Sequence, residues 1–268
     1  MAIIDFHAHI FPDALAGRAI SQLSVNGKIV AVVDGRASSL VASMDAAGID
    51  SAVVANIATK PEQFDSIMSW SRSIASERLI PFASVHPDDP DLAAHVQAVA
   101  AAGFRGIKLH PYFQKFSLDE ARLEPLYEAV SRAGLVLLMH CGFDIGFPRT
   151  RICDPARVRA VADNWPNLKL VAAHLGGWMD WDEVERCLLG RPIVMDVAAA
   201  FDYLDAGRIR SMLLAHPREF LVFGSDSPWF DQKKTLGQLR DLHLPAELEG
   251  AILHDNAARL LGLSTRAR

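Results

Sequence analysis

Cysteine is scarce in this chain of 268 residues, which contains only Cys141, Cys153 and Cys187. Three cysteines that lie far apart provide neither a paired disulfide framework nor the Cys-x-x-Cys clip of many structural metal sites. We therefore expect three reduced, buried thiols. A metal site in this protein must use other residue types.

Basic runs and long apolar runs are also missing. The net charge of −5 is spread along the chain, without the stripe of Lys and Arg that marks nucleic-acid binding. No apolar stretch reaches the length of a membrane span, and residues 1–5 lack the pattern of a secretion signal. We expect a cytosolic (cytoplasmic) protein whose partner is a small-molecule substrate, with no nucleic acid and no membrane. Whether it forms a homo-oligomer is left open.

Eight short apolar runs rich in β-forming residues recur along the chain, with segments of helical length between them. They cover residues 3–10, 51–57, 80–85, 106–110, 136–140, 168–174, 193–197 and 220–225. This alternation is typical of a parallel sheet covered by helices. Helix ends are predicted at Gly48, Gly103 and Gly134, and helix starts at Asp119 and Asp154.

The number of strand-helix units favours a closed barrel. An open dinucleotide-binding sheet carries Gly-x-Gly-x-x-Gly after its first strand, and this fingerprint is absent here. The chain also has the usual length of an α/β barrel, about 250 residues. We predict an α/β fold, a single (β/α)8 TIM barrel, with residues 1–268 forming one domain.

Histidine and aspartate residues stand at the C-terminal ends of the predicted strands, where the loops of a barrel form its active-site mouth. The two-residue period of a strand predicts that Asp5, His7 and His9 face one side of the first strand. His140 and His174 end later strands, and Asp226 stands at the end of the last one. Residues from four separate strands are thus expected to point to one place. Imidazole and carboxylate groups are common ligands of Zn²⁺ and related ions. A catalytic metal site is therefore predicted.

Taken jointly, the motifs resemble the amidohydrolase superfamily, in particular its amidohydrolase-2 branch of small metal-dependent hydrolases and related decarboxylases. The resemblance covers nearly the whole chain and rests on the motifs at residues 5–9, 106–111, 140, 174–177, 224–226 and 256–261. It implies that one divalent metal ion is held by His7, His9, His140 and Asp226. The ion is expected to be Zn²⁺, although Mn²⁺ or Fe²⁺ suits the same ligands. His174 would stand close to the activated water or the substrate.

The chemistry implied is hydrolysis of a small amide, lactone or ester by a metal-activated water. Asp226 and His174 are the predicted catalytic residues: Asp226 accepts the proton of the water, and His174 polarises the substrate or protonates the leaving group. The resemblance leaves a second interpretation, a metal-dependent non-oxidative decarboxylase (a lyase) of an aromatic or dienoic carboxylic acid. A third is a metal-binding barrel without turnover. Because this chain is nearly a minimal barrel, whereas the decarboxylases usually carry inserted loops, hydrolysis is favoured.

Further residues around the predicted mouth are candidates for substrate binding, namely Lys108, His110, Tyr112, Trp178 and Trp229. Lys108 has another interpretation, because some amidohydrolases bridge two metals with a carbamylated lysine of the fourth strand. The resemblance to the mononuclear branch disfavours it.

Other polar residues keep two interpretations each. Asp5 is either a hydrogen-bond partner of a ligand imidazole or a buried structural carboxylate. Arg149 and Arg151 either bind a substrate carboxylate or are solvated at the surface, and the second is favoured. His86 is expected to cap a loop.

Overall fold

Eight parallel strands form the centre of the computed structural model, which describes residues 2–263. They are β1 (Ile4–Ala8), β2 (Ser51–Ala55), β3 (Leu79–Phe82), β4 (Gly106–Leu109), β5 (Val136–Met139), β6 (Lys169–Ala172), β7 (Val194–Asp196) and β8 (Leu221–Val222). Each predicted strand is present. Each of them ends one to three residues before its predicted C-terminal boundary.

The strands close into a barrel although regular pairing divides them into β1–β3 and β4–β8. At one junction, a bridge pairs Ala83 with Ile107, and the amide of Lys108 donates to the Ala83 carbonyl at 2.8 Å. At the other, the Phe6 amide donates to the Phe223 carbonyl at 2.8 Å, and Ala8 bridges to Ser227. The predicted (β/α)8 barrel is confirmed.

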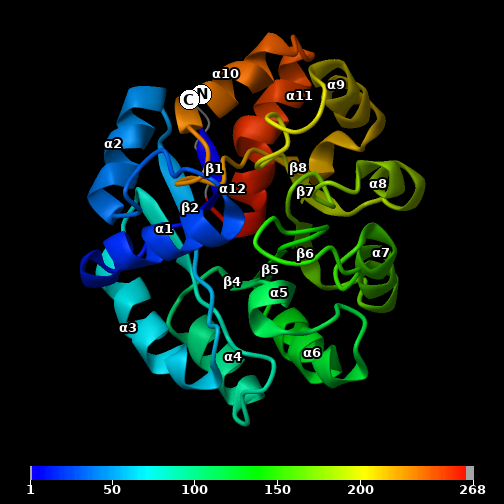
Figure 1. Cartoon of the computed structure of the whole chain (residues 1–268). Helices are drawn as coiled ribbons and strands as arrows, with labels where there is room; N and C mark the ends of the chain where they lie inside the picture. Colours follow the sequence, from blue (N-terminus) through cyan, green and yellow to red (C-terminus); the bar gives the residue numbers. More distant parts are fainter. Residues whose placement is uncertain (1, 264–268) are drawn as a thin grey trace.

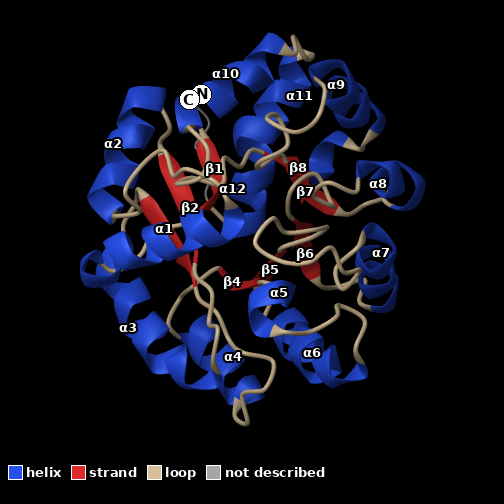
Figure 2. Cartoon of the chain, in the orientation of Figure 1, coloured by secondary structure: helices blue, strands red, loops and turns tan. Residues whose placement is uncertain are grey.

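Helices surround the strands, as Figures 1 and 2 show. They are α1 (Asp13–Gly27), α2 (Ala37–Ala47), α3 (Phe64–Ile74), α4 (Leu92–Ala101), α5 (Pro111–Gln114), α6 (Glu124–Arg132), α7 (Pro155–Asn164), α8 (Trp181–Cys187), α9 (Ala206–Ala215), α10 (Gln232–Asp241), α11 (Ala246–Gly250) and α12 (Asn256–Leu261). Short helical turns are η1 (Pro61–Gln63), η2 (Ala121–Leu123), η3 (Arg218–Phe220) and η4 (Ala251–Asp255). Among the helices that the structure describes, none is long and apolar enough to cross a membrane.

Predicted helix boundaries agree with the structure where a cap residue marks them. Helix α2 ends at Gly48, which adopts the left-handed conformation with φ of 71°. Helix α7 begins at Pro155 after Asp154. The start predicted at Asp119 is wrong, because the chain first makes the turn η2 and α6 begins only at Glu124.

Helix α1 was not predicted, and its packing explains why. Ala16 is its only buried residue, so α1 lacks the broad apolar stripe that identifies a helix packed against a sheet. Figure 1 shows it lying across the strands in front of β1 and β2 rather than in the outer ring. Its residues Leu15 and Leu23 line the cavity at the barrel mouth. The helix thus forms part of the wall of that cavity.

An irregularity in β1 places its side chains differently from the simple two-residue period. The register against β2 shifts between Asp5 and Ala8. Phe6 packs edge-on against Phe82, with the rings 5.8 Å apart, in a cluster that includes residues of most other strands and of α12. Asp5, by contrast, bonds to Gln232 of α10. The prediction that Asp5 faces the same side as His7 is therefore wrong.

Candidate metal centre

Three acceptor atoms meet at the mouth of the barrel, contributed by the ends of β1 and β8. His7 Nε2 lies 3.2 Å from His9 Nε2 and 3.6 Å from Asp226 Oδ1. His9 Nε2 lies 3.3 Å from the same Asp226 oxygen. The sequence predicted that these three residues converge, and the structure brings them together.

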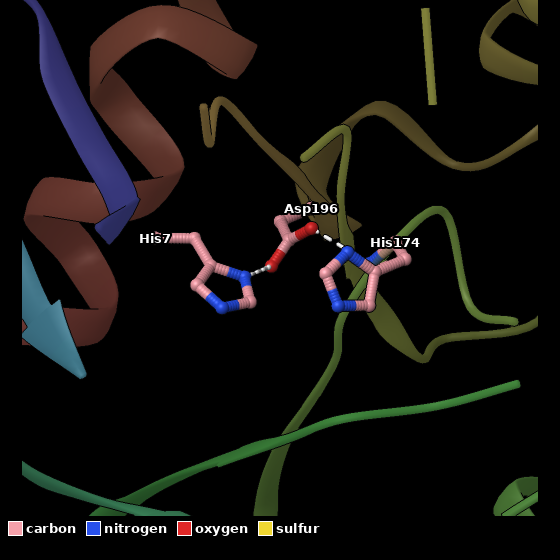
Figure 3. Close-up of side chains that lie close together, drawn as sticks. All are labelled: His7, His174 and Asp196. Carbon is pink, nitrogen blue, oxygen red and sulfur yellow. Dashed lines mark hydrogen bonds and ion pairs between the residues drawn. The ribbon is translucent and has the colours of Figure 1, made fainter. Parts of the chain in front are cut away.

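The Nδ1 atoms of His7 and His9 each lie close to a hydrogen-bond acceptor. His7 Nδ1 lies 2.9 Å from Asp196 Oδ2, and Figure 3 shows Asp196 between His7 and His174. His9 Nδ1 lies 2.7 Å from the carbonyl oxygen of Ala55. A carbonyl and a carboxylate accept hydrogen bonds, so Nδ1 carries the proton in each ring. Both Nε2 atoms therefore present lone pairs to one another and to Asp226.

The arrangement of these three atoms fits the coordination of a divalent ion. Four ligands held about 2.0–2.2 Å from Zn²⁺ in a tetrahedron lie roughly 3.3–3.6 Å apart. The three separations among His7, His9 and Asp226 span 3.2 to 3.6 Å. Facing lone pairs on two imidazoles and a carboxylate repel each other unless a cation or a donor lies between them. Two imidazoles and one carboxylate suit Zn²⁺, Mn²⁺ or Fe²⁺.

His140 does not join those three atoms in one compact group but faces His174. His140 Nδ1 is 3.0 Å from His174 Nε2. The other nitrogens of the two rings lie 3.0 Å from the Phe143 carbonyl and 3.2 Å from the Ala198 carbonyl. Both facing nitrogens are thus lone pairs in the neutral rings. The role of His140 as a fourth ligand stays a prediction.

Lys108 is the one amine at this centre among the described residues. It is fully buried, and its Nζ lies 3.2 Å from His7 Nε2. Burial lowers the pKa of this lysine to about 8, although Asp196 and Asp226 oppose the shift. Without an ion, Lys108 donates to the His7 lone pair. Its amine is therefore close enough to a bound ion to influence it or to contact a substrate.

A second wall of the site is made by His110, His140 and Asp144. The His110 and His140 rings stack 4.0 Å apart, and His110 Nε2 lies 3.3 Å from Asp144 Oδ2. Burial and the charge of Lys108 hold the pKa of His110 well below its usual value. His110 is consequently a neutral ring beside a carboxylate that the sequence did not single out.

Electrostatics keep the ligand groups in the states that metal binding needs. Burial, and then the charge of Lys108, hold the pKa of His7 well below its usual value, so the ring is neutral. Burial raises the pKa of the Asp226 carboxyl, but the neighbouring rings of His9, His7 and His174 outweigh it and leave the pKa lowered. A neutral imidazole and an ionised carboxylate are the ligating forms.

Asp196 is a second carboxylate at the site that the sequence did not single out. It ends β7 and is fully buried. While Oδ2 faces His7, Oδ1 accepts from the backbone amides of His174 and Ala198 at 2.8 and 3.0 Å. A carboxylate at the end of an apolar strand was the available signal. The predicted strand extended past it to Val197, so it was taken as part of the sheet.

Of the two interpretations of Asp5, the hydrogen bonds of this residue support that of a buried structural carboxylate. Its oxygens accept from the hydroxyl of Ser225, the amide group of Gln232 and the backbone amides of His7 and Ser225. It makes no bond to an imidazole ring. Asp5 thereby fixes the backbone of β1 against the loop that carries Asp226, whose own amide donates to the His7 carbonyl at 2.7 Å.

The remaining candidates divide between the cavity and the layer behind it. A cavity of about 440 Å³ is lined by Lys108, His110, Trp178 and Trp229 together with the metal-site residues. Tyr112 does not line it; its hydroxyl donates to the Thr150 carbonyl at 2.6 Å. His86 caps its loop as expected, because its Nδ1 accepts from the Asp88 amide at 3.1 Å. All three cysteines are free, with Cys141 and Cys153 buried and Cys187 half-buried.

Comparison with known proteins agrees with this architecture. Residues 4–263 match the family model described as Amidohydrolase. No protein with a curated description matches the chain. An uncharacterised TIM-barrel protein from Bordetella bronchiseptica superposes with a TM-score of 0.79 at 20% identity, covering 98% of this chain and 99% of the other.

Two solved structures similar in fold carry named activities. A putative 2-pyrone-4,6-dicarboxylic acid hydrolase from Pseudomonas putida has a TM-score of 0.67 and 19% identity, with 97% of each chain covered. The 5-carboxyvanillate decarboxylase from Novosphingobium aromaticivorans, solved with bound manganese, has a TM-score of 0.72 and 14% identity, covering 98% of this chain and 97% of the other. Likeness at this identity shows the fold, whereas the family match spans nearly the whole sequence. The chain therefore belongs to the amidohydrolase family.

Proposed function

We propose that the protein is a metal-dependent hydrolase that cleaves a small amide, lactone or ester with an activated water. The observation that carries the proposal is the set of facing lone pairs on His7, His9 and Asp226, whose separations of 3.2 to 3.6 Å match the edges of a metal-coordination tetrahedron. When bound, a Zn²⁺-type ion would lower the pKa of water to about 7 and supply hydroxide near neutral pH. Mn²⁺ or Fe²⁺ would serve the same ligands.

The protein residues divide the proton transfers between them. Asp226 has a second carboxylate oxygen that can accept the proton of the attacking water. His174 Nδ1 lies 3.2 Å from the Ala198 carbonyl, so its Nε2, which faces His140 Nδ1 at 3.0 Å, is the nitrogen that can take up a proton. In the protonated state, His174 donates from Nε2 to the leaving group. Both side chains line the same cavity, so a substrate can contact both.

The local backbone supports these two positions. His174 and Asp226 both adopt positive φ, at 62° and 64°. Non-glycine residues in this region are uncommon, and such conformations cluster at functional sites. The Asp196 carboxylate accepts a hydrogen bond from the His174 amide, and the His7 carbonyl accepts one from the Asp226 amide. The conformations are therefore fixed by the same residues that hold the ligand imidazoles.

The test is turnover with product analysis. Protein loaded with Zn²⁺ or Mn²⁺ is assayed against a panel of amides, lactones and esters in ¹⁸O-labelled water. We expect label in the product acid, and a loss in kcat of at least about a hundredfold in an Asp226→Asn variant. The matched control is Asp202→Asn, since Asp202 pairs with Lys234 outside the site.

Three results would contradict the proposal. Release of CO₂ without uptake of labelled oxygen would identify a decarboxylase. Full activity of the Asp226→Asn variant would remove the assigned base. Metal binding without turnover of any compound in the panel would leave a binding protein.

A further inference from the structure

The outer part of the cavity is apolar and is built by three segments distant in sequence. We call apolar wall the side chains of Leu23, Ile29, Ile67, Trp70, Ile145 and Phe147, all of which line the cavity. Leu23 belongs to α1 and Ile29 lies two residues beyond that helix. Ile67 and Trp70 belong to α3, and Ile145 and Phe147 lie in the loop between β5 and α7. A methyl group placed on Gly27 would lie 3.3 Å from both Ile145 and Ile29, so these two side chains meet at that glycine. The wall is thus continuous from α1 to the loop.

Charged groups lining the cavity are few and mostly acidic. Within the described chain, Lys108 is the only lysine or arginine that lines it, and its Nζ is held 3.2 Å from His7 at the ligand cluster. The lining carboxylates are Asp226, at the same cluster, and Asp144. Asp144 lies near the apolar wall, where its Oδ1 accepts from the Gly146 amide at 2.7 Å. The outer cavity therefore contains a carboxylate, whose Oδ2 lies 3.3 Å from the neutral His110 ring, and no lysine or arginine.

Two arginines of the same loop are directed elsewhere. Arg149 donates to the Met179 carbonyl at 3.0 Å, and its guanidinium lies 4.3 Å from the centre of the Phe143 ring. Arg151 pairs with Asp180 at 3.0 Å and also with Glu183. Neither lines the cavity. The interpretation of these residues as solvated surface arginines is the one that their contacts support.

We infer that the substrate is a neutral molecule whose non-reacting part is a hydrophobic group seated on the apolar wall. The inference rests on the proposed hydrolytic function and specifies its substrate class. A carboxylate in the outer cavity would lose its hydration without gaining a cationic partner, and it would face Asp144. A hydrocarbon or aromatic group there is stabilised by burial, at about 25 cal/mol per Å² of apolar surface.

Binding of a matched pair of amides tests this without requiring turnover. Hexanamide and adipamate, the monoamide of adipic acid, share a chain length and differ in whether the far end is a methyl or a carboxylate. Titration calorimetry on the metal-loaded protein measures both dissociation constants. We expect hexanamide to bind at least about tenfold more tightly. Equal or tighter binding of adipamate, or no binding of hexanamide at millimolar concentration, would overturn the inference.

A charge added to the apolar wall should reverse the preference. Leu23 is half-buried on α1 and lies outside the ligand cluster, so Leu23→Arg should fold and place a guanidinium where the substrate ends. We expect the ratio of the two dissociation constants to shift at least about tenfold towards adipamate. Leu23→Gln, similar in size and uncharged, is the matched control. An unchanged ratio in the arginine variant would contradict the assignment of the wall.

The outcomes also separate this inference from the proposed function. Tighter binding of hexanamide than of adipamate, without hydrolysis of any ester, lactone or amide, would reject the hydrolase. The assigned shape and charge of the cavity would then still stand. Hydrolysis that prefers substrates with a distal carboxylate would confirm a hydrolase and reject the neutral substrate class.

Discussion

Asp196 Oδ2 lies 2.9 Å from His7 Nδ1 and fixes the imidazole so that its other nitrogen is a lone pair at the ligand cluster. The two residues are 189 positions apart in sequence, on β7 and β1. Carboxylates in this position orient a ligand histidine and raise its basicity. The same carboxylate accepts from the His174 amide, so one side chain positions both the proposed metal ligand His7 and the proposed catalytic residue His174.

We predict that Asp196→Asn weakens metal binding about 10- to 100-fold. The asparagine oxygen can still accept from the His174 and Ala198 amides, so the backbone should keep its conformation. Its NH₂ group would face His7 Nδ1 as a donor, and His7 would then carry its proton on Nε2, where it cannot bind a metal. Competition with a chromophoric chelator measures the affinity. Asp202→Asn should leave it unchanged, and wild-type affinity in the Asp196→Asn variant would exclude the orienting role.

Removing the metal should lower thermal stability as well as activity. An ion that binds only the folded state stabilises it by about 2.7 kcal/mol when its free concentration is a hundred times its Kd. We expect Tm to fall after dialysis against a chelator and to recover when Zn²⁺ or Mn²⁺ is added. His9→Gln should abolish the recovery, whereas His243→Asn, at an exposed residue in the loop just after α10, should retain it. A Tm that does not respond to metal in the wild type would contradict the metal centre.

The sequence was sufficient to predict the barrel and most of the cluster, for one physical reason. Ligands at the ends of parallel strands reach one mouth, so His7, His9 and Asp226 converge whatever the exact strand boundaries are. Hydrogen-bond partners depend on registers between strands, which apolar periodicity does not encode. Asp196 was overlooked for that reason, and Asp5 was assigned to the wrong face because the register shift in β1 cannot be seen in the alternation.

The residues that line the cavity were the hardest part of the site to predict from the sequence. Helix α1 buries only Ala16, so its sequence shows no core-facing stripe. Tyr112 follows β4 just as the lining residues follow their strands, yet its hydroxyl donates to the Thr150 carbonyl and it does not line the cavity. Loop conformation decides such positions, and strand patterns do not report it.

Gly142 should tolerate no side chain, because the loop after β5 passes directly against the segment that carries Trp178. Its φ is 88°, and a Cβ there would lie 2.1 Å from the Trp178 amide nitrogen. We expect Gly142→Ala to lower the free energy of unfolding by about 2–5 kcal/mol, as the sum of backbone strain and overpacking. Gly190→Ala separates the two effects, since Gly190 has a φ of 79° and open space around it; about 1–2 kcal/mol is expected there. Denaturant unfolding measures both, and equal losses would show that the close approach is unimportant.

His216 should make the fold sensitive to mild acid independently of the metal centre. It is buried before β8, its Nε2 donates to the Ile193 carbonyl at 2.9 Å, and burial lowers its pKa below the usual 6.5. The unfolded chain therefore binds the proton more tightly than the folded one. Stabilisation by the neutral ring is complete above pH 6.5 and is lost as the pH falls from there towards the folded pKa. In His216→Gln, whose amide can still donate to Ile193, the decline in unfolding free energy over this interval should be shallower. His254→Gln, next to Asp255 in η4, should keep the wild-type slope, and an identical slope in the His216 variant would show that this histidine does not titrate with folding.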